Sequence, residues 1–274
     1  VGSADIVDTQ GVFTEVDFEG FHLEFSLALI ANSVETFRRQ YVSRTVSEWF
    51  GELDTIIETL NQALSWSKYS HYLIKASSHY TEIQRWLKQD KMVIPVGQEG
   101  HAFTLIKCGD YFAIGDRRGL ESGEGIPIYF MNRASRLTAD LVIEMVYSNN
   151  QIVGITETLK KELGLVKVAE MPLRQQITGN CSWANVEAAI PVLFYMLQCS
   201  DASLPKSRQK NIMGDSLELL ARWRDWDTGR SLQFCMQEYQ AASTARKASI
   251  TSLLAAIFAQ RLSADHDEHV AWSK

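Results

Sequence analysis

The apolar and polar residues near the start of the chain alternate in a way that is typical of β-strands. Residues 14–27 keep this alternation on both sides of Glu19-Gly20, a pair suited to a tight turn. The alternating apolar positions are Val16, Phe18, Phe21, Leu23 and Phe25. We therefore expect a β-hairpin with one buried face. The preceding Val1-Gly2-Ser3 resembles the remnant of an expression tag and is left out of this prediction.

Helical periodicity replaces the alternation between residues 33 and 88. Ser33 is the predicted N-cap of a first helix, because apolar residues then recur at three- and four-residue spacing. A second helix is expected from about Leu53, and a third around Ile83. Together with the hairpin, these helices form a predicted N-terminal region, residues 1–90.

Short apolar runs bounded by glycines predict a sheet in the middle of the chain. The expected strands are 92–96, 102–106, 111–115 and 126–130. Gly109 and Asp110 lie between the second and third runs, so these two strands should form an antiparallel hairpin.

Residues after 137 are mostly helical in pattern. Helices are expected over 141–146, 152–163 and 182–199, the last with a kink at Pro191, and further helices end near Leu262. The predicted fold is α+β: an antiparallel sheet packed against the helix that starts near residue 181, with helices on both sides in the sequence. We expect a core at 91–200 and a C-terminal helical region at 201–274, all within one compact unit.

Composition places the chain among ordinary globular proteins. Of its 274 residues, 46% are hydrophobic and 22% are charged, which excludes a disordered, collagen-like or disulfide-scaffold chain. A net charge of −6 without a long basic run argues against nucleic-acid binding. The apolar stretches, such as 250–258, are too short to span a bilayer, and acidic residues near the start argue against a signal peptide.

Four cysteines are widely spaced, which indicates reduced thiols and neither disulfides nor a zinc site. Cys199 and Cys235 lie in apolar helical segments and are expected in the core, whereas Cys108 falls at a hairpin turn. Cys181 stands at the start of a predicted helix, where unpaired N–H groups and the helix dipole lower a thiol pKa. A buried residue of the capping region would have the same sequence context, so both interpretations stay open at this point.

A cysteine nucleophile needs a base, and the base needs a group that orients it. His101 begins one strand of the predicted central hairpin, and Asp116 follows the other strand. The start of one antiparallel strand faces the end of the next, so these two side chains should lie side by side. Gln175 or Gln176, just before Cys181, could supply a side-chain donor to an oxyanion.

Metal and cofactor sites have little support in the sequence. His266 and His269 lie among acidic residues, but a polar tail rarely holds a metal ion. No glycine-rich nucleotide-binding motif is present. We expect neither a metal nor a cofactor.

The order His101, Asp116, Gln175 or Gln176, Cys181 resembles that of one cysteine-protease clan. That clan contains ubiquitin-like-protein proteases, bacterial deubiquitinases and related acetyltransferases. Residues 101–119 and 179–185 are also similar to the cysteine-protease-like domain of effectors injected by intracellular bacterial pathogens, including ankyrin-repeat effectors. The resemblance covers roughly residues 91–198 and implies a papain-like, ubiquitin-like-protease-like core.

This resemblance implies a role for each matched residue. Cys181 would be the nucleophile, His101 the general base and Asp116 the group that orients it, with Gln175 or Gln176 in the oxyanion hole. The sequence departs from the ubiquitin-like-protein proteases at two positions. Ala102 follows the histidine where they usually carry Trp, and Ser182 replaces the Gly that follows their nucleophile.

The function expected from these residues is that of a thiol peptidase. The resemblance implies a peptide or isopeptide bond in a host protein as substrate, with ubiquitin or a ubiquitin-like modifier as a candidate, and secretion by a bacterial injection system into the host cytosol. Two alternatives remain: an acyltransferase that uses the same triad, and a non-catalytic protein-binding effector module on a protease scaffold.

Overall fold

The computed structural model describes most of the chain, in two compact units, Val1–Leu217 and Glu218–Lys274. The described residues are 2–7, 13–18, 23–41, 43–70, 80–98, 101–117, 125–147, 152–174, 181–199, 204–244, 246–252 and 254. The candidate site and the pocket discussed below belong to the first unit.

The N-terminal hairpin is present, but the prediction places it at the wrong residues. The hairpin pairs β1 (Gly2–Val7) with β2 (Phe13–Phe18), so the first residues of the chain are part of it. Leu23 begins helix α1 (Leu23–Gln40), and Ser33 is buried within this helix instead of capping it. Buried apolar residues recur along α1 at helical spacing: Leu23, Leu27, Ile30, Val34 and Phe37. This longer periodicity outweighs the short alternation through residue 25.

Three further helices precede the sheet. They are α2 (Arg44–Ser47), α3 (Phe50–Ser70) and α4 (Tyr80–Leu87). The second and third predicted helices are thereby confirmed, and α3 packs against both α1 and the first strand of the sheet.

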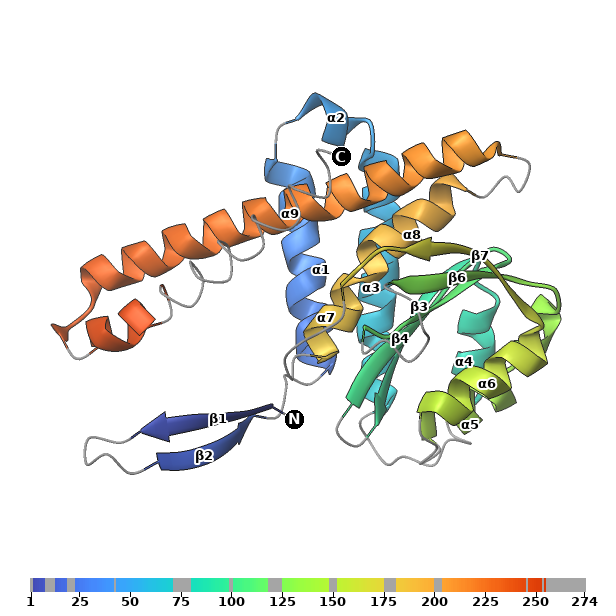
Figure 1. Ribbon diagram of the computed structural model, residues 1–274, viewed down its shortest axis with the longest axis horizontal. Coiled ribbons are helices and arrows are strands. Elements are labelled where there is room, and N and C mark those ends of the chain that lie inside the picture. Colours follow the sequence, from blue (N-terminus) through green and yellow to red (C-terminus); the bar gives the residue numbers. More distant parts are fainter. Residues whose placement is uncertain are drawn as a thin grey trace. The chain divides into compact units, whose positions relative to one another are not determined.

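A five-stranded antiparallel sheet forms the centre of the first unit (Figure 1). Its strands follow in sequence order: β3 (Lys91–Gln98), β4 (His101–Cys108), β5 (Tyr111–Gly115), β6 (Ile126–Met131) and β7 (Leu165–Met171). Gly109, with φ of +57°, provides the left-handed residue in the tight turn between β4 and β5. The α+β class and the four predicted strands are confirmed.

Strand β7 was not expected from the sequence. It lies at one edge of the sheet and pairs only with β6 among the described strands. Val166 and Val168 are about half exposed, so the strand lacks the clear alternation of a half-buried one.

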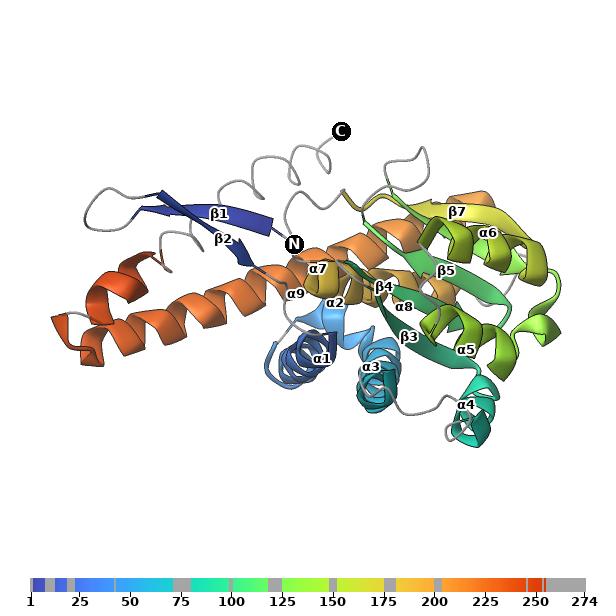
Figure 2. The ribbon, with the colours of Figure 1, turned by 90° about the horizontal axis from the view of Figure 1, so that it is seen from below.

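Helices cover both faces of the sheet. A short 3₁₀ turn (Ala134–Arg136) leads into α5 (Ala139–Tyr147) and α6 (Ile152–Leu163), which share one apolar core with strand residues such as Phe103 and Leu105. Thr104, on the alternate face of β4, instead bonds to α7 (Cys181–Glu187). In both views, α7 and α8 (Ala189–Gln198) lie on the other side of β4 from α5 and α6 (Figures 1 and 2).

The long helix predicted over 182–199 is two helices, α7 and α8, that meet at Ala188. Pro191 lacks an N–H, and its ring clashes with the carbonyl four residues earlier, which belongs to Glu187. The expected kink is therefore a break, and it falls just before the proline.

Helix α9 (Lys206–Ala241) begins in the first unit and continues into the second. Within the second unit, Arg222 pairs with Glu218 at 2.6 Å and Arg230 with Asp227 at 2.9 Å along the helix surface. In the described part of the chain, none of the helices has the length and apolar character needed to cross a membrane.

Candidate active site

His101 and Asp116 form a buried pair at one end of the sheet. His101 is the first residue of β4, and Asp116 comes directly after β5. The register pairs Thr104 with Gly115, so Asp116 is a diagonal neighbour of His101 across the hairpin. Nε2 of His101 lies 3.0 Å from Oδ1 of Asp116, and the two residues are only 6% and 8% exposed. The predicted juxtaposition is confirmed.

Cys181 lies beside this pair but belongs to a different element, helix α7. It is the first residue of α7, it is partly exposed, and its thiol lies close enough to the His101 side chain for that side chain to lower the thiol pKa. Burial raises the pKa of the Cys181 thiol, but hydrogen bonds with His101 and with the backbone of Ala102 and Ser182, together with the charge of His101, outweigh it. The net effect lowers the thiol pKa, which favours the thiolate.

The three side chains lie together at this end of the sheet. Asp116 engages Nε2 of His101, and the same imidazole lowers the pKa of the Cys181 thiol. An imidazole held in this way can take the thiol proton on one nitrogen while the carboxylate stabilises the resulting cation on the other. The arrangement can therefore generate a nucleophile and return its proton to a leaving group.

Asn185 connects α7 to both strands of the hairpin, and sequence reasoning missed it. Its Nδ2 donates to the Ala102 carbonyl at 2.6 Å, and its Oδ1 accepts the Arg117 N–H at 2.9 Å. Its own carbonyl accepts the Thr104 hydroxyl at 3.0 Å. One signal was available in the sequence: a polar residue one helical turn after Cys181, between the apolar residues Ala184 and Val186.

A second set of polar contacts anchors the residue after Asp116. Arg117 Nε donates to the Arg174 carbonyl at 2.8 Å, and its Nη1 lies 3.4 Å from the Glu187 carboxylate. Gly115 permits a close approach here, because a Cβ at this position would collide with the Thr104 hydroxyl. These contacts hold the sheet end against α7.

Several predicted residues lie outside the described part of the chain. Gln175 and Gln176 do so, and the oxyanion-hole role therefore stays a prediction. The tail histidines, His266 and His269, are also outside it. Within the described ranges, no group of three or more His, Cys, Asp or Glu side chains is arranged to hold a metal ion.

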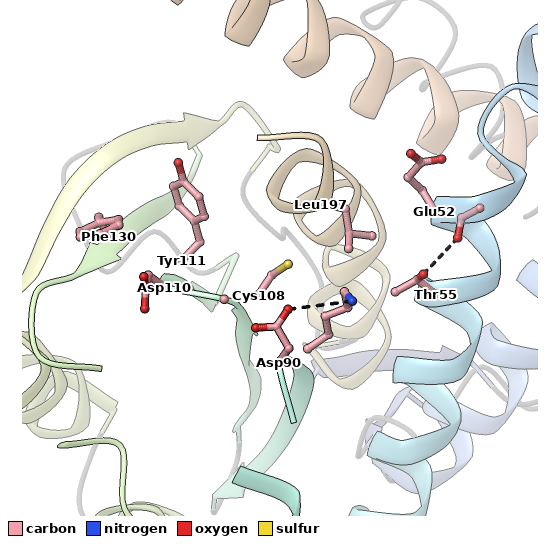
Figure 3. A pocket seen from close by; sticks show the side chains of 11 residues that line it. Glu52, Thr55, Asp90, Cys108, Asp110, Tyr111, Phe130 and Leu197 are labelled. Carbon is pink, nitrogen blue, oxygen red and sulfur yellow. Dashed lines mark hydrogen bonds and ion pairs between the residues drawn. The ribbon is translucent and has the colours of Figure 1, made fainter. Parts of the chain in front are cut away.

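The opposite end of β4 carries another cysteine in a different setting. Cys108 is buried beside a pocket of about 670 Å³ (Figure 3), and desolvation followed by the charge of Asp90 raises its thiol pKa to about 11. The pocket is lined by Gly51, Glu52, Thr55, Asp90, Lys91, Cys108, Gly109, Asp110, Tyr111, Phe130 and Leu197. Cys199 and Cys235 are buried as expected, and desolvation raises the pKa of Cys199. Three described thiols have shifted pKa values, those of Cys108, Cys181 and Cys199, and among them only Cys181 has a histidine that lowers its pKa.

Comparison with known proteins finds similarity to a solved structure. No protein-family model matches the sequence, and no curated protein matches it significantly. The structure of the Legionella effector AnkH is similar, with a TM-score of 0.75 and 32% sequence identity over 93% of this chain. The match covers 54% of the AnkH chain, so the present chain spans about half of its length. The fold described here therefore also occurs in a bacterial effector.

Proposed function

We propose that this chain is a thiol peptidase with Cys181 as nucleophile, His101 as general base and Asp116 as the group that orients the imidazole. The observation that carries the proposal is the buried His101–Asp116 pair, with Nε2 3.0 Å from Oδ1, beside a Cys181 thiol whose pKa His101 lowers. Nucleophile, base and orienting group in this order are the parts that covalent acyl-transfer catalysis requires.

In the proposed reaction, His101 takes the thiol proton as the Cys181 sulfur attacks the carbonyl carbon of a peptide or isopeptide bond. The backbone N–H of Cys181 and a side-chain amide of Gln175 or Gln176 stabilise the oxyanion. The imidazolium gives its proton to the departing amine, and a thioester remains on Cys181. His101 then activates a water molecule, which hydrolyses the thioester to release a carboxylic acid and the free thiol.

The substrate and setting follow from the resemblance to injected effectors. The match to AnkH at 32% identity supports a bacterial effector that acts inside host cells. We take its substrate to be a host protein, with ubiquitin or a ubiquitin-like modifier as the first candidate. The proposed catalytic core of this chain is papain-like.

The test is intact-mass analysis after treatment with iodoacetamide and, separately, with electrophilic probes made from the C-termini of ubiquitin-family proteins. The wild type is compared with Cys181→Ala, His101→Ala and the matched control Cys108→Ala. We expect one probe to add a single modifier to the wild type and to Cys108→Ala, and none to the other two variants.

Other outcomes would redirect the proposal. If Cys181 is alkylated no faster than Cys108 in the wild type, the triad is not active and a non-catalytic binding module becomes the better explanation. A stable acyl adduct on Cys181 from an acyl-coenzyme A donor would instead favour an acyltransferase.

A further inference from the structure

Asn185 occupies a position that the proposed chemistry does not use directly. Its side chain is fully buried in α7, four residues after Cys181, and therefore about one helical turn along the same helix. Both functions of its amide are engaged: Nδ2 donates to Ala102 and Oδ1 accepts from Arg117.

The two backbone groups that Asn185 holds are the immediate neighbours of the base and its partner. Ala102 follows His101, and Arg117 follows Asp116. The amide thus bridges the two strand ends that carry the imidazole and the carboxylate. Its helix presents the thiol to them, and the Thr104 bond to the Asn185 carbonyl adds a third link between the same elements.

We infer that Asn185 is a positioning residue that sets the location of the Cys181 thiol relative to the His101–Asp116 pair. The inference rests on the proposed function of that site. Because 80 residues separate His101 from Cys181 along the chain, only tertiary contacts determine the thiol–imidazole geometry on which proton transfer depends. Asn185 supplies such contacts at both strands together.

The hydrogen-bonding groups of asparagine, more than its size, suit it to this position. One side chain must donate to a carbonyl and accept from an N–H, and an amide does both. An ionised aspartate of nearly the same shape cannot donate to the Ala102 carbonyl. An alanine can make neither bond, and it leaves two buried backbone groups without their partner.

A structural role alone and a positioning role predict different results. Loss of a buried hydrogen-bonded side chain lowers stability in either case. Only a positioning role also changes the pH dependence of the Cys181 thiol in the folded protein, because that dependence reports the contact with His101.

The experiment measures the iodoacetamide alkylation rate of Cys181 against pH, with each cysteine quantified separately by peptide mass spectrometry. Wild type, Asn185→Ala and Asn185→Asp are compared with Thr59→Ala. Thr59 is a matched control because it is buried and its hydroxyl bonds to the carbonyl of Thr55 on its own helix, α3.

We expect the midpoint of the Cys181 profile to move to higher pH in both Asn185 variants and to stay unchanged in Thr59→Ala. Each unit of increase in the thiol pKa lowers the rate at neutral pH about tenfold. Cys108 in the same sample reports folding, because its buried thiol is alkylated rapidly only after unfolding.

A folded Asn185→Ala variant with the wild-type pH profile overturns the inference. The proposed function stands in that case if Cys181 of the wild type is alkylated rapidly and His101→Ala slows its alkylation. If the alanine variant unfolds, Asn185→Asp decides, and a wild-type profile there overturns the inference. A wild-type Cys181 with an ordinary thiol profile contradicts the proposed function itself.

Discussion

A cysteine lies near each end of strand β4, and the pKa values of the two thiols shift in opposite directions: Cys181 begins α7 beside His101, and Cys108 ends the strand itself. Near His101, hydrogen bonds to the imidazole and to two backbone groups outweigh desolvation and lower the pKa of Cys181. At the other end, desolvation acts together with the charge of Asp90 and raises the pKa of Cys108 to about 11. Desolvation raises the pKa of both thiols, so it does not set the direction of the net shift. The partners of the sulfur do.

The two ends also differ in how their charges are held. At the site end, Arg117 and Glu187 form an ion pair whose side chains are 13% and 9% exposed. At the pocket end, Lys91 and Asp90 are 3.9 Å apart, with side chains 39% and 69% exposed (Figure 3). The site end is cross-linked by buried polar contacts, whereas the pocket end is open to solvent.

The largest expected effect comes from Asp116→Asn. The amide preserves the shape of the side chain but cannot stabilise the imidazolium, so we expect peptidase turnover to fall by about 10⁴-fold. A Cys108→Ala control should retain turnover, since that residue lies at the far end of β4. Turnover of a host-protein substrate or a modifier-based fluorogenic substrate measures this effect. Equal activity in Asp116→Asn and the wild type would show that the carboxylate does not orient the base.

The next effect compares the two ion pairs. Arg117→Met removes the partner of the buried Glu187 carboxylate and the bond to the Arg174 carbonyl, so the free energy of unfolding should fall by about 3 kcal/mol. Lys91→Met breaks an exposed pair and should change it by less than about 1 kcal/mol. Urea unfolding of both variants measures the difference. Similar losses in the two would remove the contrast between the ends.

The free energy of unfolding should fall at alkaline pH because of the buried Cys108 thiol. Its pKa is raised in the folded state from 9.0 to about 11, so the folded protein retains a proton that the unfolded chain loses. The resulting stabilisation is complete below about pH 9 and is lost as pH rises to about 11, a change of about 2–3 kcal/mol.

Urea unfolding under reducing conditions at several pH values would measure this loss, with Cys108→Ala as the reference. The variant should show a smaller alkaline decrease than the wild type. The remaining decrease comes from other groups whose pKa values burial raises, such as Tyr195 and Cys199. Identical slopes in both proteins would contradict the assignment to Cys108.

The smallest effect compares two glycines. A methyl group at Gly115 would collide with the Thr104 hydroxyl at the site end, so Gly115→Ala should lower stability by about 1–2 kcal/mol and slow Cys181 alkylation. At the pocket end, a Cβ on Gly51 meets no atom within 4 Å, so Gly51→Ala should be neutral or stabilising by up to about 1 kcal/mol. Thermal melting with alkylation rates tests the pair, and a neutral Gly115→Ala would remove the packing argument.

Local patterns predicted strands β3 to β6 well, but they misplaced the start of α1 and missed β7. Strands β3 to β6 are each a compact apolar run beside a glycine, and a turn at Gly109 joins two of them, so neighbouring residues determine them. The start of α1 was misplaced because alternation through residue 25 is also compatible with a helical period that only becomes clear further along. Strand β7 was missed because its outward residues are apolar, as Val166 and Val168 illustrate.

The sequence by itself determined that His101 and Asp116 meet, because fifteen residues and one tight turn bring them together within a single hairpin. It also placed Cys181 at the start of a helix. Only the tertiary structure decided that Asn185 bridges this helix to both strands, and that Cys181, unlike Cys108, has a lowered pKa. The physical reason is that a thiol pKa depends on the groups within a few ångströms of the sulfur, and here the imidazole among them comes from a strand 80 residues away.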